Sequence, residues 1–218
     1  MILPSSRADI AAAEAPAAAE TRPADADAAA ARTRADYGRV SRWGLGLLGT
    51  AGALVAGALL SFAASVTASG VDPLGDLLFA GFMVLVAAVF AVPSVWLLIA
   101  LHRSGRRLAR AAGFWAGLPY RQGRRRPTKG DWFAVRFLGF SSDLFLRLIT
   151  SALAGLAAVF TISVLIRGVV IGQGVDALVL WASWSVVFAS VCAGQFGGVQ
   201  RIQNGYLPRD PASLTRGR

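Results

Sequence analysis

The chain has 218 residues, of which 55% are apolar and 16% are charged, whereas an ordinary soluble domain has about 25% charged residues. Lys and Arg number 22 and Asp and Glu number 12, which gives a net charge of +10, and the mean hydropathy is +0.55. So few charged residues could not cover the surface of a soluble protein of this size. This excludes an ordinary cytosolic enzyme and a disordered interaction hub. The single cysteine, Cys192, excludes an internal disulfide framework.

The first 36 residues are rich in alanine, contain three prolines and have no aromatic side chain. Such a segment has little apolar surface to bury, so nothing offsets the conformational entropy that ordering would cost. We therefore predict that residues 1–36 form a disordered tail. Acidic residues within this segment argue against an organelle-targeting peptide, because such peptides are poor in them; they include Asp9, Glu14, Glu20, Asp25 and Asp27.

Four segments without a charged residue or a histidine follow, at residues 43–71, 77–101, 148–166 and 177–200. A helix rises about 1.5 Å per residue, so about 20 residues cross a hydrocarbon core of about 30 Å. Backbone polar groups in lipid must be bonded within the protein, which favours helices over an open sheet. The predicted fold class is an all-α integral membrane protein, with one four-helix membrane domain at residues 37–206. Its spans are expected at about residues 44–66, 77–101, 147–170 and 177–199.

Small residues recur at every fourth position in the first and the fourth of these segments. Such ridges let helix backbones approach closely in a membrane. We predict helix packing through two sets, which are Gly49, Ala53, Gly57 and Ser61, and Ser185, Ala189, Ala193 and Gly197. The pattern leaves open whether each ridge meets another helix of this chain or a second copy. A ridge of this kind is expected to tolerate Gly57→Ala much better than Gly57→Leu.

The connection between the second and third spans, residues 102–146, is long and basic. Its first part, residues 101–116, has the pattern of an amphipathic basic helix, which either continues the second span or lies on the lipid headgroups. A basic loop with Gly and Pro follows, and the aromatic stretch at residues 131–147 is predicted to form an interfacial helix. Nine basic residues are predicted to contact lipid or a partner: Arg103, Arg106, Arg107, Arg110, Arg121, Arg124, Arg125, Arg126 and Lys129.

Three ligands suit this positive charge: anionic lipid headgroups, an acidic protein partner and nucleic acid. Basic residues near a membrane surface are attracted to anionic lipid by about 1 kcal/mol each. No recognised nucleic-acid-binding motif accompanies the basic residues, and a membrane surface already accounts for them, so we predict no nucleic-acid partner. The predicted partners are the anionic headgroups of the bilayer, together with either another membrane protein or a second copy of the chain.

The distribution of basic residues predicts the orientation of the chain. Of the 22 Lys and Arg residues, 21 lie before the first span, between the second and third spans, or after the fourth. Short basic segments stay on the cytoplasmic side, so we predict a multi-pass protein of the cytoplasmic membrane with both termini in the cytoplasm. The last segment, residues 207–218, is predicted to be a disordered cytoplasmic tail. The basic residues include 21 Arg and one Lys, and with the high Ala content this indicates a bacterium with a GC-rich genome.

The chemistry available to the chain is sparse. His102 is the single histidine, and no metal-ligand spacing, nucleophile–base set or phosphate-binding glycine motif is present. Coupled transporters usually place an acidic residue or a histidine at the bilayer midplane, and none occurs in the middle of a span. We therefore predict a non-catalytic accessory, scaffold or regulatory membrane protein without a cofactor. Two alternatives stay open, namely an oligomeric small transporter or channel component, and a membrane-embedded enzyme that acts on lipid phosphates.

Overall fold

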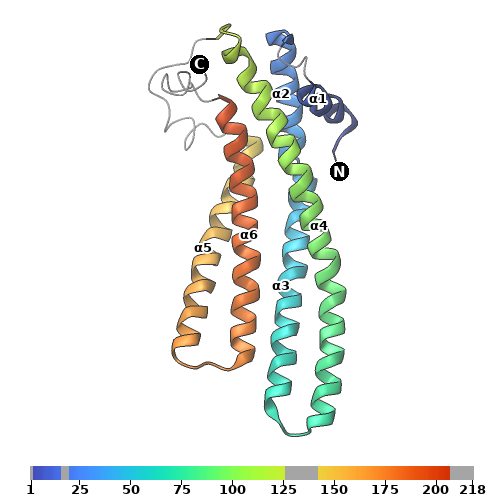
Figure 1. Cartoon of the computed structure of the whole chain (residues 1–218), viewed down its shortest axis with the longest axis vertical. Helices are drawn as coiled ribbons and strands as arrows, with labels where there is room; N and C mark the ends of the chain where they lie inside the picture. The colour runs from blue at the N-terminus through green and yellow to red at the C-terminus, as the bar shows by residue number, and fades with distance from the viewer. Residues whose placement is uncertain (1, 16–19, 126–141, 207–218) are drawn as a thin grey trace. The chain divides into compact units, whose positions relative to one another are not determined.

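The computed structural model describes residues 2–15, 20–125 and 142–206, and every regular element in these ranges is a helix. The predicted tail at residues 207–218 and most of the predicted interfacial helix at residues 131–147 lie outside the described residues. The helices, shown in Figure 1, are α1 (Pro4–Glu14), α2 (Pro23–Gly38), α3 (Val40–Ser69), α4 (Pro73–Arg121), α5 (Ser142–Val170) and α6 (Val175–Tyr206).

Four helices in the described part of the chain are long and apolar enough to cross a membrane, judged by length and composition. These are Ala24–Ser69, which joins α2 to α3, together with Pro73–Arg121, Leu144–Val170 and Val175–Gly205. The prediction of an all-helical chain with four apolar helices of spanning length is thus confirmed.

The chain divides into two compact units. The apolar unit comprises residues 43–101 and 149–195, and it contains the uncharged segments. The polar unit comprises residues 1–42, 102–148 and 196–218, and it contains nearly all the charges. Helices α3, α4, α5 and α6 each contribute to both units.

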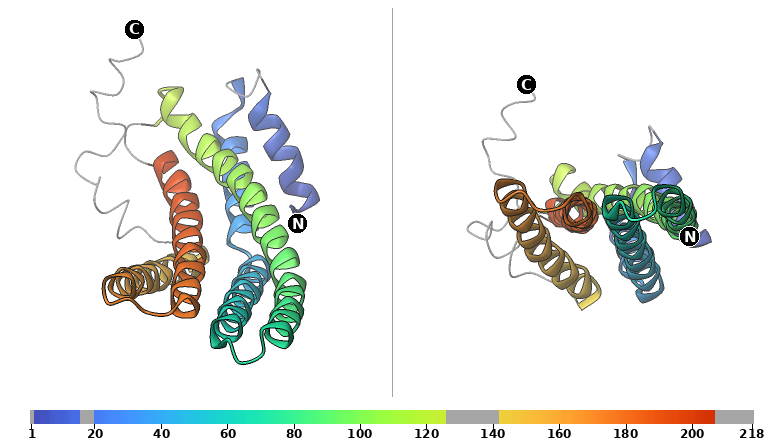
Figure 2. Two further views of the ribbon diagram at one scale, coloured as in Figure 1. Left: turned by 60° about the horizontal axis from the view of Figure 1, so that its bottom comes forward. Right: turned by 90° about the horizontal axis from the view of Figure 1, so that it is seen from below.

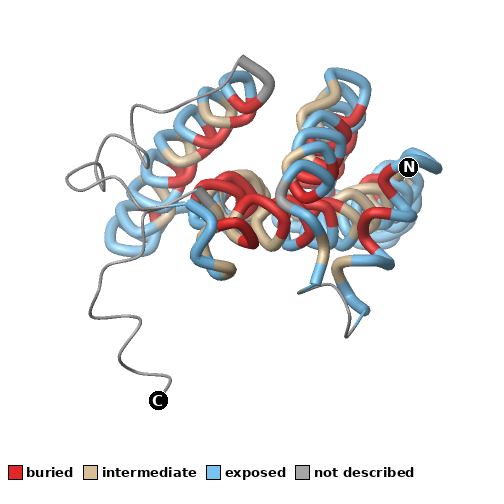
Figure 3. Tube along the Cα trace, turned by 90° about the horizontal axis from the view of Figure 1, so that it is seen from above, coloured by how far each residue is buried: buried red, intermediate tan, exposed pale blue. Residues whose placement is uncertain are grey.

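Two helical hairpins make up the apolar unit (Figures 1 and 2). Gly70 begins the turn between α3 and α4 with φ +63°, and Gly172 lies in the turn between α5 and α6 with φ +70°. Glycine adopts this left-handed conformation without the steric cost that a side chain would bring. In the first turn, the Asp76 carboxylate accepts a hydrogen bond from the Ser69 hydroxyl at 2.8 Å. Most large apolar side chains of this unit are exposed, as lipid-facing residues would be (Figure 3).

Helix α4 runs without a break for 49 residues, from Pro73 to Arg121. The basic stretch at residues 101–116 therefore continues the second apolar segment as one helix. The amphipathic pattern also allowed a separate helix on the lipid headgroups, and the structure shows the continuous helix instead. Arg121 follows His102 by 19 positions in α4, which is about 29 Å at 1.5 Å per residue.

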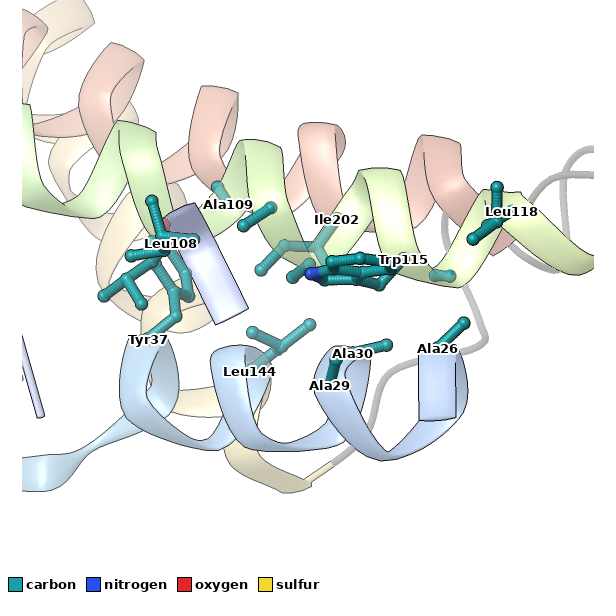
Figure 4. Packing of buried hydrophobic residues seen from close by; sticks show 14 residues of the cluster. Ala26, Ala29, Ala30, Tyr37, Leu108, Ala109, Trp115, Leu118, Leu144 and Ile202 are labelled. Carbon is teal, nitrogen blue, oxygen red and sulfur yellow. The ribbon is translucent and has the colours of Figure 1, made fainter. Parts of the chain in front are cut away.

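The polar unit has a hydrophobic core of its own, built around the C-terminal part of α4. Trp115, Leu108 and Leu118 are at most 2% exposed, and Figure 4 shows Trp115 facing Ala29 and Ala30 of α2. Ile10, Ala26, Leu144 and Ile202 belong to the same cluster, which therefore draws on α1, α2, α4, α5 and α6.

The N-terminal segment differs from our prediction of a disordered tail at residues 1–36. Pro4–Glu14 and Pro23–Gly38 are helical, and α1 lies against α2 and beside α4 (Figure 2). An Ala-rich segment can fold where another part of the chain offers it a partner surface. Helix α4 supplies one, because the large ring of Trp115 packs against the small alanine faces, and its Nε1 donates to the Asp9 carbonyl oxygen at 3.1 Å.

Candidate functional site

Four arginines form a stripe on α4 just after the uncharged segment ends at Leu101. We call Arg103, Arg106, Arg107 and Arg110 the basic stripe; all four are exposed. Their spacings of three, four and seven residues place them on one face of the helix. They lie within eight residues of His102, or about 12 Å along the helix axis. The stripe thus presents four guanidinium groups at the polar end of an apolar helix.

The side of α4 away from the stripe is covered by other helices. Leu108, Ala112 and Trp115 are buried in the core of the polar unit. Gly113 faces the backbone of α6, where a Cβ built on it would lie 2.5 Å from the Arg201 carbonyl oxygen. Gly205 of α6 in turn faces the backbone of Gly113. The two helices therefore meet backbone to backbone, and packing fixes which face of α4 carries the exposed arginines.

Two of the predicted contact residues are engaged by acidic residues of the N-terminal helices. Arg107 forms an ion pair with Glu14 of α1 at 3.1 Å, and Arg125 forms one with Asp27 of α2 at 2.5 Å. The Arg107–Glu14 side chains are 55% and 59% exposed, so the pair contributes about 0–1 kcal/mol and is screened by salt. These arginines are thus held by this chain's own carboxylates, but only weakly.

The other predicted contact residues divide into three groups. Arg103, Arg106 and Arg110 are exposed on the stripe, and Arg124 is exposed beyond the end of α4. Arg121 lies over the Phe114 ring at 4.3 Å and donates to the Phe114 carbonyl oxygen at 2.9 Å. Arg126 and Lys129 lie outside the described residues. The described members of this set therefore lie in different surroundings.

A buried polar cluster around Tyr37 joins the helices of the polar unit, and sequence reasoning missed it. The Arg147 guanidinium lies 4.4 Å from the centre of the Tyr37 ring, and Arg42 donates to the Ser104 hydroxyl at 2.9 Å. Tyr37, Arg42 and Arg147 are all less than 8% exposed. Gly198 of α6 leaves room for the Tyr37 hydroxyl, which a Cβ there would meet. The available signal was that Tyr37 is the first aromatic residue of the chain.

The predicted ridge on α3 packs inside this chain, but against two different helices. Gly49 faces Leu98 of α4, where an added Cβ would lie 3.1 Å from Leu98 Cγ. Gly57 faces α6, and an added Cβ there would meet Ser183 Oγ and would lie 3.3 Å from Trp184 Cδ1. Ser61 donates to the Asp176 carbonyl oxygen at 2.8 Å, and Ala53 between these residues is half-buried. Even the small Cβ of Gly57→Ala would therefore require Ser183 or Trp184 to shift.

The predicted ridge on α6 does not pack as a continuous strip. Ser185 is buried and its hydroxyl bonds the Trp181 carbonyl oxygen of its own helix, and Gly197 is half-buried. Ala189 and Ala193 are exposed.

Helix α6 instead meets α5 through Cys192. The Ser151 hydroxyl donates to the Cys192 carbonyl oxygen at 3.2 Å, and an added Cβ on Gly155 would lie 3.2 Å from Cys192 Sγ. The α5–α6 contact thus uses a position next to the predicted ridge.

In the described ranges, no three His, Cys, Asp or Glu side chains gather closely enough to hold a metal ion. No family model matches the chain, and neither a curated protein nor a solved structure matches it.

Proposed function

We propose that the protein is a non-catalytic accessory or regulatory membrane protein whose basic stripe binds anionic lipid headgroups on the cytoplasmic side. The observation that carries the proposal is the stripe itself. Arg103, Arg106 and Arg110 are exposed and follow directly on an uncharged helix long enough to span a membrane. Cytoplasmic headgroups are the anions expected next to such a helix end.

Distance along α4 supports assigning lipid to the stripe rather than to all nine basic residues. The stripe lies within about 12 Å of His102 along the helix axis, whereas Arg121 comes about 29 Å after it. Electrostatic attraction in physiological salt falls off over a Debye length of about 8 Å. The distal arginines therefore suit contacts within the polar unit, as Arg125 makes with Asp27.

The hydroxyl groups of the apolar unit favour this proposal over a transporter or channel. Thr161 bonds the Ala157 carbonyl oxygen of its own helix, and Ser163 bonds that of Val159. Other polar side chains link helices, as Trp43 does when its Nε1 donates to the Thr150 hydroxyl at 2.8 Å. Groups that are already bonded within or between helices suit a structural role better than a pore lining.

The test compares two triple variants that lose the same charge. Arg103→Gln/Arg106→Gln/Arg110→Gln removes most of the stripe, and the control Arg7→Gln/Arg22→Gln/Arg124→Gln removes three exposed arginines elsewhere. Native mass spectrometry of the purified full chain would measure binding of phosphatidylglycerol and of phosphatidylcholine.

At about 1 kcal/mol per basic residue, we expect the stripe variant to lose at least tenfold in phosphatidylglycerol affinity. The control is expected to retain most of it. Equal affinities of the two variants for phosphatidylglycerol, or no preference of the wild type for it, would refute the proposal.

A further inference from the structure

The N-terminal helices bring acidic residues to a basic helix. Residues 1–38 contain six of the twelve acidic residues of the chain. Two of them, Glu14 and Asp27, pair with the arginines Arg107 and Arg125, which lie in or just after α4. The N-terminal helices therefore place carboxylates against arginines in and just after α4.

Glu14 contacts one member of the basic stripe, Arg107. Arg107 comes four residues after Arg103 and three before Arg110, so it neighbours both of them at one edge of the stripe on the helix surface. Its Nη2 donates to both carboxylate oxygens of Glu14, at 3.1 and 3.3 Å. A lipid phosphate held by the stripe would approach the same guanidinium, and the carboxylate would repel it.

We propose that Glu14 is a built-in competitor of anionic lipid, so that α1 regulates the stripe. This inference rests on the proposed lipid-binding function. Glu14 and a lipid phosphate are alternative partners of Arg107, and binding of one weakens binding of the other. Because coupling between two binding equilibria is reciprocal, lipid must loosen Glu14 by the same factor by which Glu14 weakens lipid binding.

The position of Glu14 in α1 makes this exchange feasible without unfolding the polar unit. Glu14 is the last residue of α1, and the terminal turn of a helix frays readily. The remainder of α1 is anchored upstream, where Asp9 binds Arg32 of α2 at 2.8 Å and Ile10 is buried. Only the end of α1 needs to move for Arg107 to change partner.

The first measurement is the phosphatidylglycerol affinity of the full chain carrying Glu14→Gln. Removing one repelling charge and freeing one arginine is expected to raise the affinity about fivefold, which corresponds to one basic residue near a membrane surface. The matched control is Glu20→Gln, which makes the same charge change at an exposed residue between α1 and α2. This control is expected to change the affinity less than twofold.

The second measurement is hydrogen exchange of the backbone amides of residues 11–15 in nanodiscs. Exchange of the wild type is expected to be about fivefold faster in phosphatidylglycerol than in phosphatidylcholine, because lipid displaces Glu14. The Arg103→Gln/Arg106→Gln/Arg110→Gln variant should lose most of this lipid dependence.

Two results would overturn the inference in distinguishable ways. If the wild type prefers phosphatidylglycerol but Glu14→Gln binds it no better than Glu20→Gln does, the competition is refuted and the proposed function stands. If the wild type shows no preference for phosphatidylglycerol, the proposed function fails, and the competition fails with it.

Discussion

The contact between α4 and α6 at Gly113 gives the sharpest prediction about stability. In Gly113→Ala, the new Cβ would lie 2.5 Å from the Arg201 carbonyl oxygen, about 0.9 Å inside the 3.4 Å at which ordinary contact begins. The obstacle is helix backbone, which cannot rotate away as a side chain can. Relief therefore requires the two helices to separate or to shift along each other.

Overpacking of this kind costs about 1–3 kcal/mol, and the higher helix propensity of alanine returns at most about 1 kcal/mol. We therefore expect Gly113→Ala to destabilise the protein by about 1–2 kcal/mol. For a chain of this length, each kcal/mol shifts the Tm by about 2–4 °C. Thermal unfolding in mild detergent, followed by circular dichroism, would measure the difference.

The matched controls are Gly44→Ala and Gly81→Ala, which make the same chemical change in α3 and α4. A Cβ at either position meets nothing within 4 Å. Both variants should therefore unfold at the wild-type Tm or slightly above it. A Gly113→Ala protein with a Tm equal to that of these controls would refute the close backbone approach of α4 and α6.

Three further predictions concern other parts of the molecule. Gly57→Ala should lower the Tm measurably, because its Cβ meets Ser183 Oγ and Trp184 Cδ1, and Gly57→Leu should lower the Tm more. An unchanged Tm for Gly57→Ala would show that the Ser183 side chain turns away at little cost. Trp115→Ala should destabilise the polar unit by about 3–5 kcal/mol, because Trp115 is 2% exposed; hydrogen exchange of α1 and α2 should rise severalfold, and unchanged exchange would contradict their docking. In a Cys192→Ser chain, a single cysteine introduced at Ser69 or Gly174 should react with a membrane-impermeant thiol reagent in intact cells. A cysteine introduced at Gly123 should react only after the cells are permeabilised. The reverse pattern would contradict the proposed orientation.

The predicted contacts of the small-residue ridges show how far a repeat can be interpreted without tertiary structure. A spacing of four identifies one helix face, and Gly49 and Gly57 do pack closely on α3. Their neighbours are different helices, because α3 contacts Leu98 of α4 at one level and Ser183 of α6 at another. On α6 the same spacing includes Ala189 and Ala193, which are exposed. Abundant Ala and Gly produce such repeats whether or not a partner is present.

The backbone contact at Gly113 and Gly205 was missed for a related reason. Neither glycine belongs to the small-residue repeats noted within the uncharged segments. Their role depends on which faces of α4 and α6 meet, and that is decided by the packing of the whole polar unit. No local pattern in either segment reports this pairing.

The sequence by itself determined the four apolar helices. Uncharged runs of at least 19 residues favour helices in lipid, because a helix bonds its backbone N–H and C=O groups within the same segment. The turns could be located by the same reasoning, since Asp72 and Asp76 separate the first two runs and Arg167 and Asp176 separate the last two. These features depend on neighbouring residues in the chain, which a sequence displays directly.

Tertiary structure alone decided the fate of the N-terminal segment and the roles of the arginines. An Ala-rich segment has too little apolar surface to fold by itself, yet α1 and α2 pack where α4 offers Trp115, about 100 residues away. The same packing lets Arg107 form an ion pair with Glu14, and Arg125 one with Asp27, while Arg103 stays exposed. Composition counts charges, but the pairing of charges distant in sequence depends on which helix faces meet.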